Sequence, residues 1–324
     1  MRAVRVHELT GPDGLRIDVI PDPTAGAGQV VIEVAAAGVN FPDLLISRGQ
    51  YQFKPSPPFI PGGEAAGTVI AVGAGVTSLA VGDRVASTVL YGAYAERIAV
   101  PEMSTVKVPA SVDFTIAAAT LLTYGTTYHA LVDRAALKAG ETLLVLGAAG
   151  GVGIAAVELG ALLGARVIAA ASSDDKLEFC RAHGATDVIN YEREDLKDRL
   201  KALTGGKGVD VVYDPVGGAF SESALRGVGW QGRYLVVGFA AGDIPKIPLN
   251  LVLLKGCQIL GVFWGSFAMR EPARNRANGD QIFAWVAEGK LKPAIDAVLP
   301  FAQAGEALRR IERRAVKGKL VLIP

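Results

Sequence analysis

Apolar runs alternate with helical patterns from residue 142 onward at a regular spacing. An apolar strand at 143–146 precedes a small-residue helix from Ile154 to Leu163 and a second strand, Arg166–Ala171. Strands separated by helices of this length pair in parallel through right-handed crossovers, so the pattern predicts an α/β fold with a doubly wound parallel sheet. The later elements predicted are helices Asp174–His183, 195–203 and Phe220–Gly227, and strands Asp187–Ile189, Val209–Tyr213, Arg233–Gly238 and Cys257–Phe263.

Before residue 109 the pattern is different, with short β-rich runs broken by glycine and proline, which indicates a mostly β domain. Helical spacing follows from Asp113 to Ala135. The tail predicts helices at 281–288 and 304–313 and a closing strand, Leu320–Ile323, which we expect to complete the first domain. A chain of 324 residues exceeds one ordinary core. We therefore predict a mostly β domain at 1–122 plus 265–324 and a dinucleotide-binding domain at 123–264.

Composition narrows the class of protein. Half of the residues are apolar, 20% are charged and the net charge is +1, so nothing favours nucleic acid or an anionic membrane as a partner. The longest apolar stretch is interrupted by Glu158 and Arg166, as a buried strand–helix–strand unit would be. Cys180 and Cys257 are far apart in sequence and form no disulfide framework or C-x-x-C motif. We expect an intracellular, cytoplasmic protein.

A glycine turn joins the strand at 143–146 to the helix after it. Gly150 and Gly151 allow backbone to approach a pyrophosphate, and Gly153 allows the helix to pack close to the strand. The helix N-terminus adds unpaired N–H groups that favour an anion. Ala148 departs from a strict G-x-G-x-x-G pattern by one small residue. The predicted cofactor contacts in this turn are Gly147, Ala149, Gly150, Gly151 and Val152.

The end of the second strand indicates which dinucleotide binds. An NAD site usually has an acidic residue there that bonds the ribose hydroxyls, whereas this chain has Ser172 and Ser173. These hydroxyls leave room for a 2′-phosphate, and Lys176 could neutralise it, which favours NADPH. Asp174 and Asp175 would repel that phosphate if they pointed inward, but they also suit the first turn of a helix. Lys176 as an ordinary surface residue is the alternative.

Several segments together resemble the zinc-free quinone oxidoreductase branch of the medium-chain dehydrogenase/reductase superfamily. The resemblance covers essentially the whole chain and implies a Rossmann domain beside a GroES-like catalytic domain. The matching segments are 37–43 (AGVNFPD), 48–51 (RGQY), 61–67 (PGGEAAG), 81–85 (VGDRV), 147–153, 183–185 with Tyr191, and 318–322 (GKLVL).

The resemblance also identifies what this chain lacks. Zinc-dependent alcohol dehydrogenases of the superfamily have a cysteine ligand at the position of Asn40 and a histidine ligand at the position of Gly63, so we expect no metal here. Without a metal to polarise an alcohol or simple carbonyl, the acceptor must already be electron-poor. Quinones and enones, including unsaturated thioesters, meet that requirement by accepting hydride from a dihydronicotinamide.

The resemblance implies roles for further residues. Asn40 and Asp43 are expected near the nicotinamide, although Asp43 could equally anchor its loop. The Tyr51 phenol could bond or protonate the developing oxyanion, with packing at a domain seam as the alternative. Thr126 is expected beside the nicotinamide unless its hydroxyl bonds its own helix. The other implied cofactor contacts are Tyr191, Val216, Phe239, Val262 and Phe263.

Three functional hypotheses follow. The first is an NADPH-dependent, metal-free reductase of a quinone or other small electron-poor acceptor. A reductase of enones or enoyl thioesters is the second. The third is a non-catalytic NADPH-binding protein with a structural or sensing role. The resemblance further implies a homodimer that pairs through the last strand of the dinucleotide-binding domain, predicted at Cys257–Phe263.

Overall fold

The computed structural model describes residues 1–324, which divide into two compact units. Unit 1 comprises Met1–Gly125 and Phe267–Pro324, and unit 2 comprises Thr126–Ser266. The tail therefore returns to the first unit. None of the helices is both long enough and apolar enough to cross a membrane.

Unit 2 contains a six-stranded parallel sheet with helices on both faces. Its strand order is β10-β9-β8-β11-β12-β13, so β8 and β11 are the central pair, and successive strands are added outward in opposite directions on either side of this pair. This is the strand order of a dinucleotide-binding Rossmann sheet, and it confirms the predicted fold class. The strands are β8 (Thr142–Leu146), β9 (Arg166–Ala171), β10 (Asp187–Asn190), β11 (Val209–Asp214), β12 (Val228–Val236) and β13 (Gln258–Gly261).

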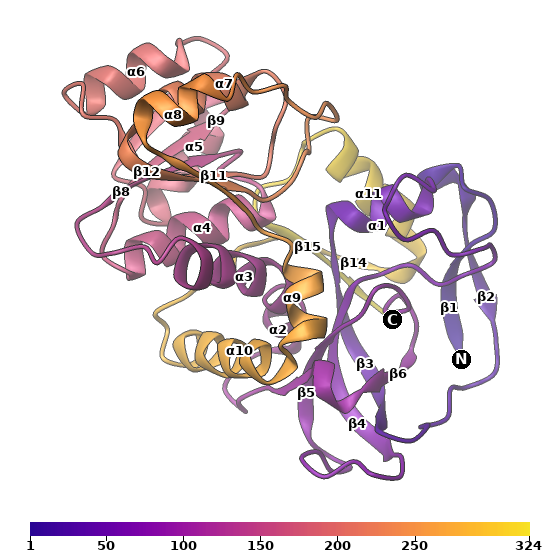
Figure 1. Ribbon diagram of the computed structural model, residues 1–324. Helices are drawn as coiled ribbons and strands as arrows, with labels where there is room; N and C mark the ends of the chain where they lie inside the picture. Colours follow the sequence, from indigo (N-terminus) through magenta and orange to yellow (C-terminus); the bar gives the residue numbers. More distant parts are fainter. The chain divides into compact units, whose positions relative to one another are not determined.

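Helices cover both faces of this sheet because the helix in each crossover packs its apolar side against the strands. In Figure 1, α6, α7 and α8 cover one face and α4 lies on the other. Leu200, Leu225 and Leu251 share one hydrophobic cluster with Leu144 and Ile168 of the sheet. The helices of unit 2 are α4 (Gly151–Leu162), α5 (Asp174–Ala182), α6 (Leu196–Leu203), α7 (Phe220–Arg226) and α8 (Asn250–Lys255), preceded by a π-helix (His129–Arg134), and α9 (Trp264–Arg270) follows β13.

Unit 1 is mostly β, as predicted. A seven-stranded sheet has the order β14-β15-β3-β4-β5-β7, and β6 pairs with β3 off this path. A separate antiparallel ribbon is formed by β1 and β2 (Figure 1). The strands are β1 (Arg2–Val6), β2 (Leu15–Val19), β3 (Gln29–Val39), β4 (Glu64–Val72), β5 (Arg84–Thr88), β6 (Arg97–Pro101), β7 (Thr105–Lys107), β14 (Ile295–Pro300) and β15 (Lys319–Ile323).

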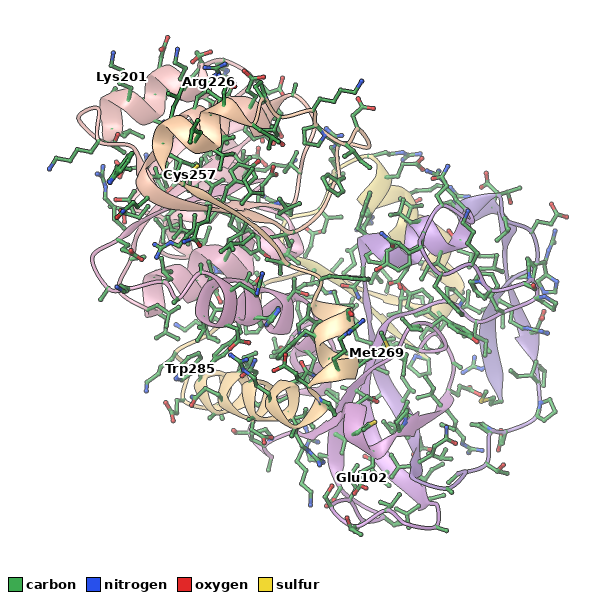
Figure 2. The ribbon with its side chains drawn as sticks, in the orientation of Figure 1. Glu102, Lys201, Arg226, Cys257, Met269 and Trp285 are labelled. Carbon is green, nitrogen blue, oxygen red and sulfur yellow. The ribbon has the colours of Figure 1, made fainter.

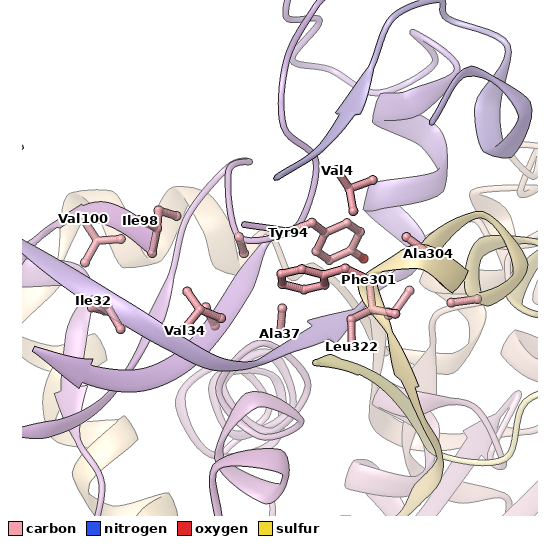
Figure 3. Packing of buried hydrophobic residues seen from close by; sticks show 14 of the residues in the cluster. Val4, Ile32, Val34, Ala37, Tyr94, Ile98, Val100, Phe301, Ala304 and Leu322 are labelled. Atoms are coloured by element: carbon pink, nitrogen blue, oxygen red, sulfur yellow. The ribbon is translucent and has the colours of Figure 1, made fainter. Parts of the chain in front are cut away.

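The core of unit 1 lies against β3 and includes residues from both ends of the chain. Figure 3 shows Tyr94 and Phe301 side by side, with Val4 and Leu322 around them. The closing strand β15 pairs antiparallel with β3, with Leu320 opposite Val39. The helices of this unit are α1 (Phe41–Ser47), α2 (Phe114–Ala118), α10 (Pro272–Ala287) and α11 (Ala304–Glu312), while α3 (Leu121–Tyr128) carries the chain into unit 2.

Several predicted boundaries were wrong, for identifiable reasons. The helix predicted from Ile154 begins at Gly151, so the glycines themselves form its first turn. The helix predicted at 281–288 begins at Pro272. Its first half is polar and so lacks the apolar spacing that marks a helix, and proline is compatible with the first helical position. The last strand of the sheet is shorter than predicted, Gln258–Gly261. Helix α8 was not predicted, and it follows a segment that contains Pro245 and Pro248.

Both cysteines are free and buried. Cys257 lies just before β13, with its Sγ 4.0 Å from the carbonyl oxygen of Val252 in α8 (Figure 2). Burial raises the pKa of the Cys180 thiol to about 12. A thiol that stays protonated is a poor nucleophile, so Cys180 fills space in the core.

Candidate functional site

The glycine turn after β8 is built around close backbone contacts. A Cβ on Gly153 would lie 2.2 Å from the carbonyl oxygen of Gly147 and 2.8 Å from the Cα of Ala148. Helix α4 can therefore approach the strand this closely only with glycine at position 153. Gly150 is the N-cap residue and offers no side-chain cap, which leaves first-turn N–H groups for an anion. The turn thus fits the pyrophosphate of a dinucleotide.

A second loop meets this turn from β11. Gly147 has φ +58°, and a Cβ there would lie 2.8 Å from Cγ2 of Val216. The buried Asp214 carboxylate holds the Val216 loop, since its Oδ1 accepts the N–H groups of Val216 and Gly217, each at 2.8 Å. The reversal of strand order between β8 and β11 places both loops where this fold binds its ligand.

Sequence reasoning did not identify Asp214. Its Oδ2 accepts hydrogen bonds from the hydroxyls of Ser221, at 2.9 Å, and Tyr234. With both oxygens bonded, the carboxylate fixes the loop rather than contacting a ligand. A carboxylate at the end of a buried strand, directly before Pro215, was the available signal.

The candidate 2′-phosphate site lies where β9 ends. The Lys176 ammonium donates to the Ser172 hydroxyl at 3.3 Å, so these two predicted residues are together. The Ser173 hydroxyl donates its hydrogen bond to Asp175. The same hydroxyl proton is therefore not available to a 2′-phosphate in this arrangement. Asp174 accepts from Asn190 and Arg193, each at 2.7 Å. The two aspartates therefore have partners of their own.

The remaining predicted cofactor residues of unit 2 differ in their burial and in their contacts. Tyr191 is half-buried with its ring 4.4 Å from that of Phe220, and Phe239 is partly exposed beside Gly217. The N–H of Val262 donates to the carbonyl of Val236 at 2.9 Å, so this N–H is used within the fold, whereas Phe263 is exposed just beyond β13.

Thr126 and Thr127 lie near the end of α3. Thr126 is half-buried. Sequence reasoning missed its neighbour, Thr127, whose hydroxyl lies 3.0 Å from the Tyr213 hydroxyl and donates to the carbonyl of Val152 at 3.3 Å. Thr127 thereby joins α3 to the first turn of α4. Its neighbours in the sequence, Thr126 and Tyr128, gave no sign of this contact.

In unit 1 the structure brings Asn40 and Asp43 together at the start of α1. The Asn40 N–H donates to Oδ2 of Asp43 at 2.8 Å, and the Tyr94 hydroxyl donates to the same oxygen at 2.8 Å. The other carboxylate oxygen, Oδ1, is buried without a hydrogen-bond partner. Burial raises the pKa of Asp43 to about 6, against the lowering effect of its hydrogen bonds and of Lys319.

The Asn40 side chain is bonded on all sides. Its Oδ1 accepts from the Lys319 ammonium at 2.5 Å, and its Nδ2 donates to Oε1 of Glu64 at 2.9 Å and to the carbonyl of Gly38 at 3.4 Å. Asn40, Glu64 and Lys319 are each at most 5% exposed. This arrangement favours a supporting role for Asn40 over direct contact with a ligand, because every polar group of its amide has a protein partner.

Tyr51 packs on a small apolar cluster formed by Val6, Ile46 and Phe59. Its pKa is raised, first by burial and second by the negative charge of Asp43. A phenol with a raised pKa stays protonated at neutral pH and can donate a hydrogen bond. Tyr51 and Asp43, which were both predicted as site residues, therefore lie close enough for the charge of Asp43 to raise the pKa of Tyr51.

Aromatic side chains that the sequence analysis did not single out adjoin Tyr51. The rings of Phe53 and Tyr91 stack with centroids 5.5 Å apart and an interplanar angle of 21°. Phe59, which also packs against Tyr51, meets Tyr91 edge-on at 6.2 Å. Phe53 and Tyr91 are 39% and 40% exposed, so part of this aromatic pair faces solvent and offers an aromatic surface. Such a surface suits a conjugated ring.

No metal-binding cluster is present: nowhere in residues 1–324 do three or more His, Cys, Asp or Glu side chains gather to hold an ion. At Gly63, a Cβ would lie 3.3 Å from Cδ1 of Leu122 and 3.6 Å from Oδ1 of Asp43. Asn40 directs its amide to Lys319 and Glu64. The residues at the expected ligand positions therefore do not fit a tetrahedral zinc ion.

Family models match both units. The alcohol dehydrogenase GroES-like domain matches residues 26–110, and the zinc-binding dehydrogenase family matches residues 151–278. The chain is 40% identical to the quinone oxidoreductase-like protein 2 homolog of Nematostella vectensis, over 99% of this chain and 88% of that protein. It is 33% identical to human quinone oxidoreductase, over 100% of this chain and 98% of that protein.

A solved structure is similar over its whole length. The crystal structure of Escherichia coli quinone oxidoreductase complexed with NADPH superposes with a TM-score of 0.94 at 31% identity, with 100% of both chains covered. The similarity extends over both units.

Proposed function

Because the chain belongs to the quinone oxidoreductase branch of the medium-chain dehydrogenase/reductase superfamily, we propose that it is an NADPH-dependent reductase of quinones or other electron-poor acceptors that works without a metal. The main supporting observation is the glycine turn, in which backbone contacts leave no room for a Cβ at Gly153. An assay of NADPH oxidation against a panel of acceptors tests the proposal.

The residues at both candidate sites fit this reaction. When bound, NADPH supplies a hydride to the acceptor. The first turn of α4 would bind the pyrophosphate, and Ser172 with Lys176 would bind the 2′-phosphate. The stacked Phe53 and Tyr91 rings favour a flat conjugated acceptor such as a quinone. Hydride addition to a quinone leaves an oxyanion, which takes up one proton to give the hydroquinone. We assign the donation of that proton to the Tyr51 hydroxyl, and the Tyr51 phenolate that remains takes up a proton from water.

Tyr51→Phe tests this assignment. We expect kcat to fall about 100-fold, because the general acid is lost while the ring remains. The melting temperature and the Kd for NADPH should stay the same, since Tyr51 packs through its ring. Steady-state kinetics with a quinone measure the effect. An unchanged kcat would assign Tyr51 to packing alone.

Lys176→Ala tests cofactor selection. Loss of one charged hydrogen bond to a phosphate costs about 1.5 kcal/mol, so KM for NADPH should rise about tenfold while KM for NADH stays unchanged. Lys201→Ala is the matched control, because Lys201 is an exposed lysine on α6 (Figure 2). Equal changes with both cofactors would contradict the phosphate assignment.

We further propose a homodimer that pairs through β13. This strand lies at the edge of its sheet, and exposed apolar side chains surround it. Trp230, Leu253 and Leu254 are 72%, 80% and 69% exposed, which is costly for a monomer. Light scattering should give twice the chain mass of 33.7 kDa, and Leu253→Glu should give the single mass. Val19→Glu, at an 83% exposed residue of β2, is the control expected to remain dimeric.

A further inference from the structure

A lysine ammonium is buried in unit 1 at the start of β15. Lys319 is 4% exposed, and its Nζ donates to the carbonyl of Val39 at 3.0 Å, to Oδ1 of Asn40 at 2.5 Å and to Oε1 of Glu64 at 2.6 Å. All three donors of the ammonium therefore have oxygen acceptors. A buried cation persists at neutral pH only with such compensation.

The carboxylate that pairs with this ammonium is itself fully engaged. Oε1 of Glu64 accepts from Lys319 and Asn40, and its Oε2 accepts the N–H of Leu122 at 3.0 Å. Glu64 is 1% exposed. It therefore links β4, β15 and the start of α3 through one charged group.

This ion pair determines how the Asn40 amide is oriented. Because the ammonium can only donate and the carboxylate can only accept, the amide oxygen must face Lys319 and the amide nitrogen must face Glu64. The same residue positions Asp43, since the Asn40 N–H donates to Oδ2 of Asp43. A continuous series of hydrogen bonds thus connects Lys319 to Asp43.

We propose that Lys319 is a positioning residue: its ammonium, balanced by Glu64, orients Asn40 and sets the electrostatic environment of Asp43 in the candidate acceptor site. The Lys319 ammonium thereby orients Asn40, one of the two positions at which the resemblance implies metal ligands in zinc-dependent alcohol dehydrogenases. Whether Asp43 then serves turnover depends on the proposed function, but the structural role of Lys319 does not.

The groups that face Asp43 determine in which direction its pKa should move when Lys319 or Glu64 is replaced. They are Tyr94 and the Asn40 N–H, which bond its Oδ2, Tyr51, and the charges of Lys319 and Glu64. Lys319 lowers the pKa of Asp43, and Glu64 raises it. Removing the cation and removing the anion should therefore move the pKa of Asp43 in opposite directions.

The test is a direct titration of Asp43 by carboxyl ¹³C NMR in the full chain, with the signal assigned by its loss in Asp43→Asn. From about 6 in the wild type, Lys319→Met should raise the pKa of Asp43 and Glu64→Gln should lower it. The double variant Lys319→Met/Glu64→Gln removes both charges and should return near the wild-type value. Where Lys319→Met does not fold, the effect of the Lys319 charge is obtained by comparing the pKa of Asp43 in Glu64→Gln with that in the double variant.

Lys107→Met is the matched control, because Lys107 is an exposed lysine on a strand of the same unit and should leave the titration of Asp43 unchanged. A pKa of Asp43 that is the same in wild type, Glu64→Gln and the double variant would overturn the proposal and leave the ion pair a purely structural one.

Activity is measured separately on the same proteins. Opposite shifts of the Asp43 titration without any turnover would support Lys319 as a positioning residue and contradict the proposed function. Turnover without those shifts would support the function and contradict the role of Lys319.

Discussion

Gly153→Ala is expected to weaken NADPH binding about 100-fold or more and to lower the free energy of unfolding by about 2 kcal/mol. The added Cβ would lie 2.2 Å from the carbonyl oxygen of Gly147 and 2.8 Å from the Cα of Ala148. Both are backbone atoms and cannot rotate away as a side chain would. The turn must therefore move, which takes the N–H groups of α4 away from the phosphates. Loss of two charge-assisted hydrogen bonds at about 1.5 kcal/mol each gives the expected change in affinity.

Two other glycines, Gly150 and Gly265, serve as controls for this result. A Cβ on Gly150 would lie 3.4 Å from the carbonyl oxygen of Gly147, so Gly150→Ala should fold with wild-type stability. At Gly265 the nearest atom would be 4.0 Å away, and Gly265→Ala should preserve stability and NADPH binding alike. Calorimetric titration with NADPH and urea unfolding measure the two quantities. Wild-type affinity in Gly153→Ala would mean that the close approach of helix and strand does not position the phosphates.

Asp43→Asn is expected to remove a pH dependence of stability that the wild type shows. The folded-state pKa of Asp43, about 6, lies above the ordinary aspartate value of 3.8. A group with a raised pKa binds its proton more tightly in the folded state, so its contribution to stability is largest below pH 3.8 and is lost as the pH rises through 6. Relative to Asp43→Asn, the wild type should lose about 2 kcal/mol of unfolding free energy between pH 4.5 and 7.5.

Comparison of the two proteins isolates Asp43 from other titrating groups. Asp22, Asp83, Glu96 and Glu102 have lowered pKa values, but they titrate alike in wild type and variant and cancel in the difference. Urea unfolding at a series of pH values gives that difference directly. A difference that stays constant from pH 4.5 to 7.5 would show that the buried carboxyl is already ionised at the lower pH.

The parallel sheet could be predicted from the sequence because its signals are local. Apolar strands, helical spacing and the glycine turn at 147–153 each act within a few residues, and β9 was predicted to the residue. The rules for crossovers then gave a doubly wound parallel sheet, whereas the strand order came from the structure. The Ser172 and Lys176 pair was also predictable, because residues four apart on this strand–helix junction lie close together.

The polar network of unit 1 could not be predicted in the same way. Asn40 and Lys319 are 279 residues apart, and only the pairing of β15 with β3 brings them together. The sequence motif containing Lys319 was noted for its resemblance to the family, with no indication that the ammonium would be buried. Asp214 was missed for a similar reason, since its partner Tyr234 lies on the neighbouring strand.

Metal-free reduction of an electron-poor acceptor by NADPH is tested most directly by steady-state NADPH oxidation, with EDTA present, against 1,2-naphthoquinone, a simple enone and crotonyl-CoA. We expect turnover with the quinone, a higher kcat/KM for NADPH than for NADH, and weaker turnover with the thioester. NADPH binding without turnover of any of the three acceptors would contradict the proposed reductase function and identify the chain as a non-catalytic dinucleotide-binding protein.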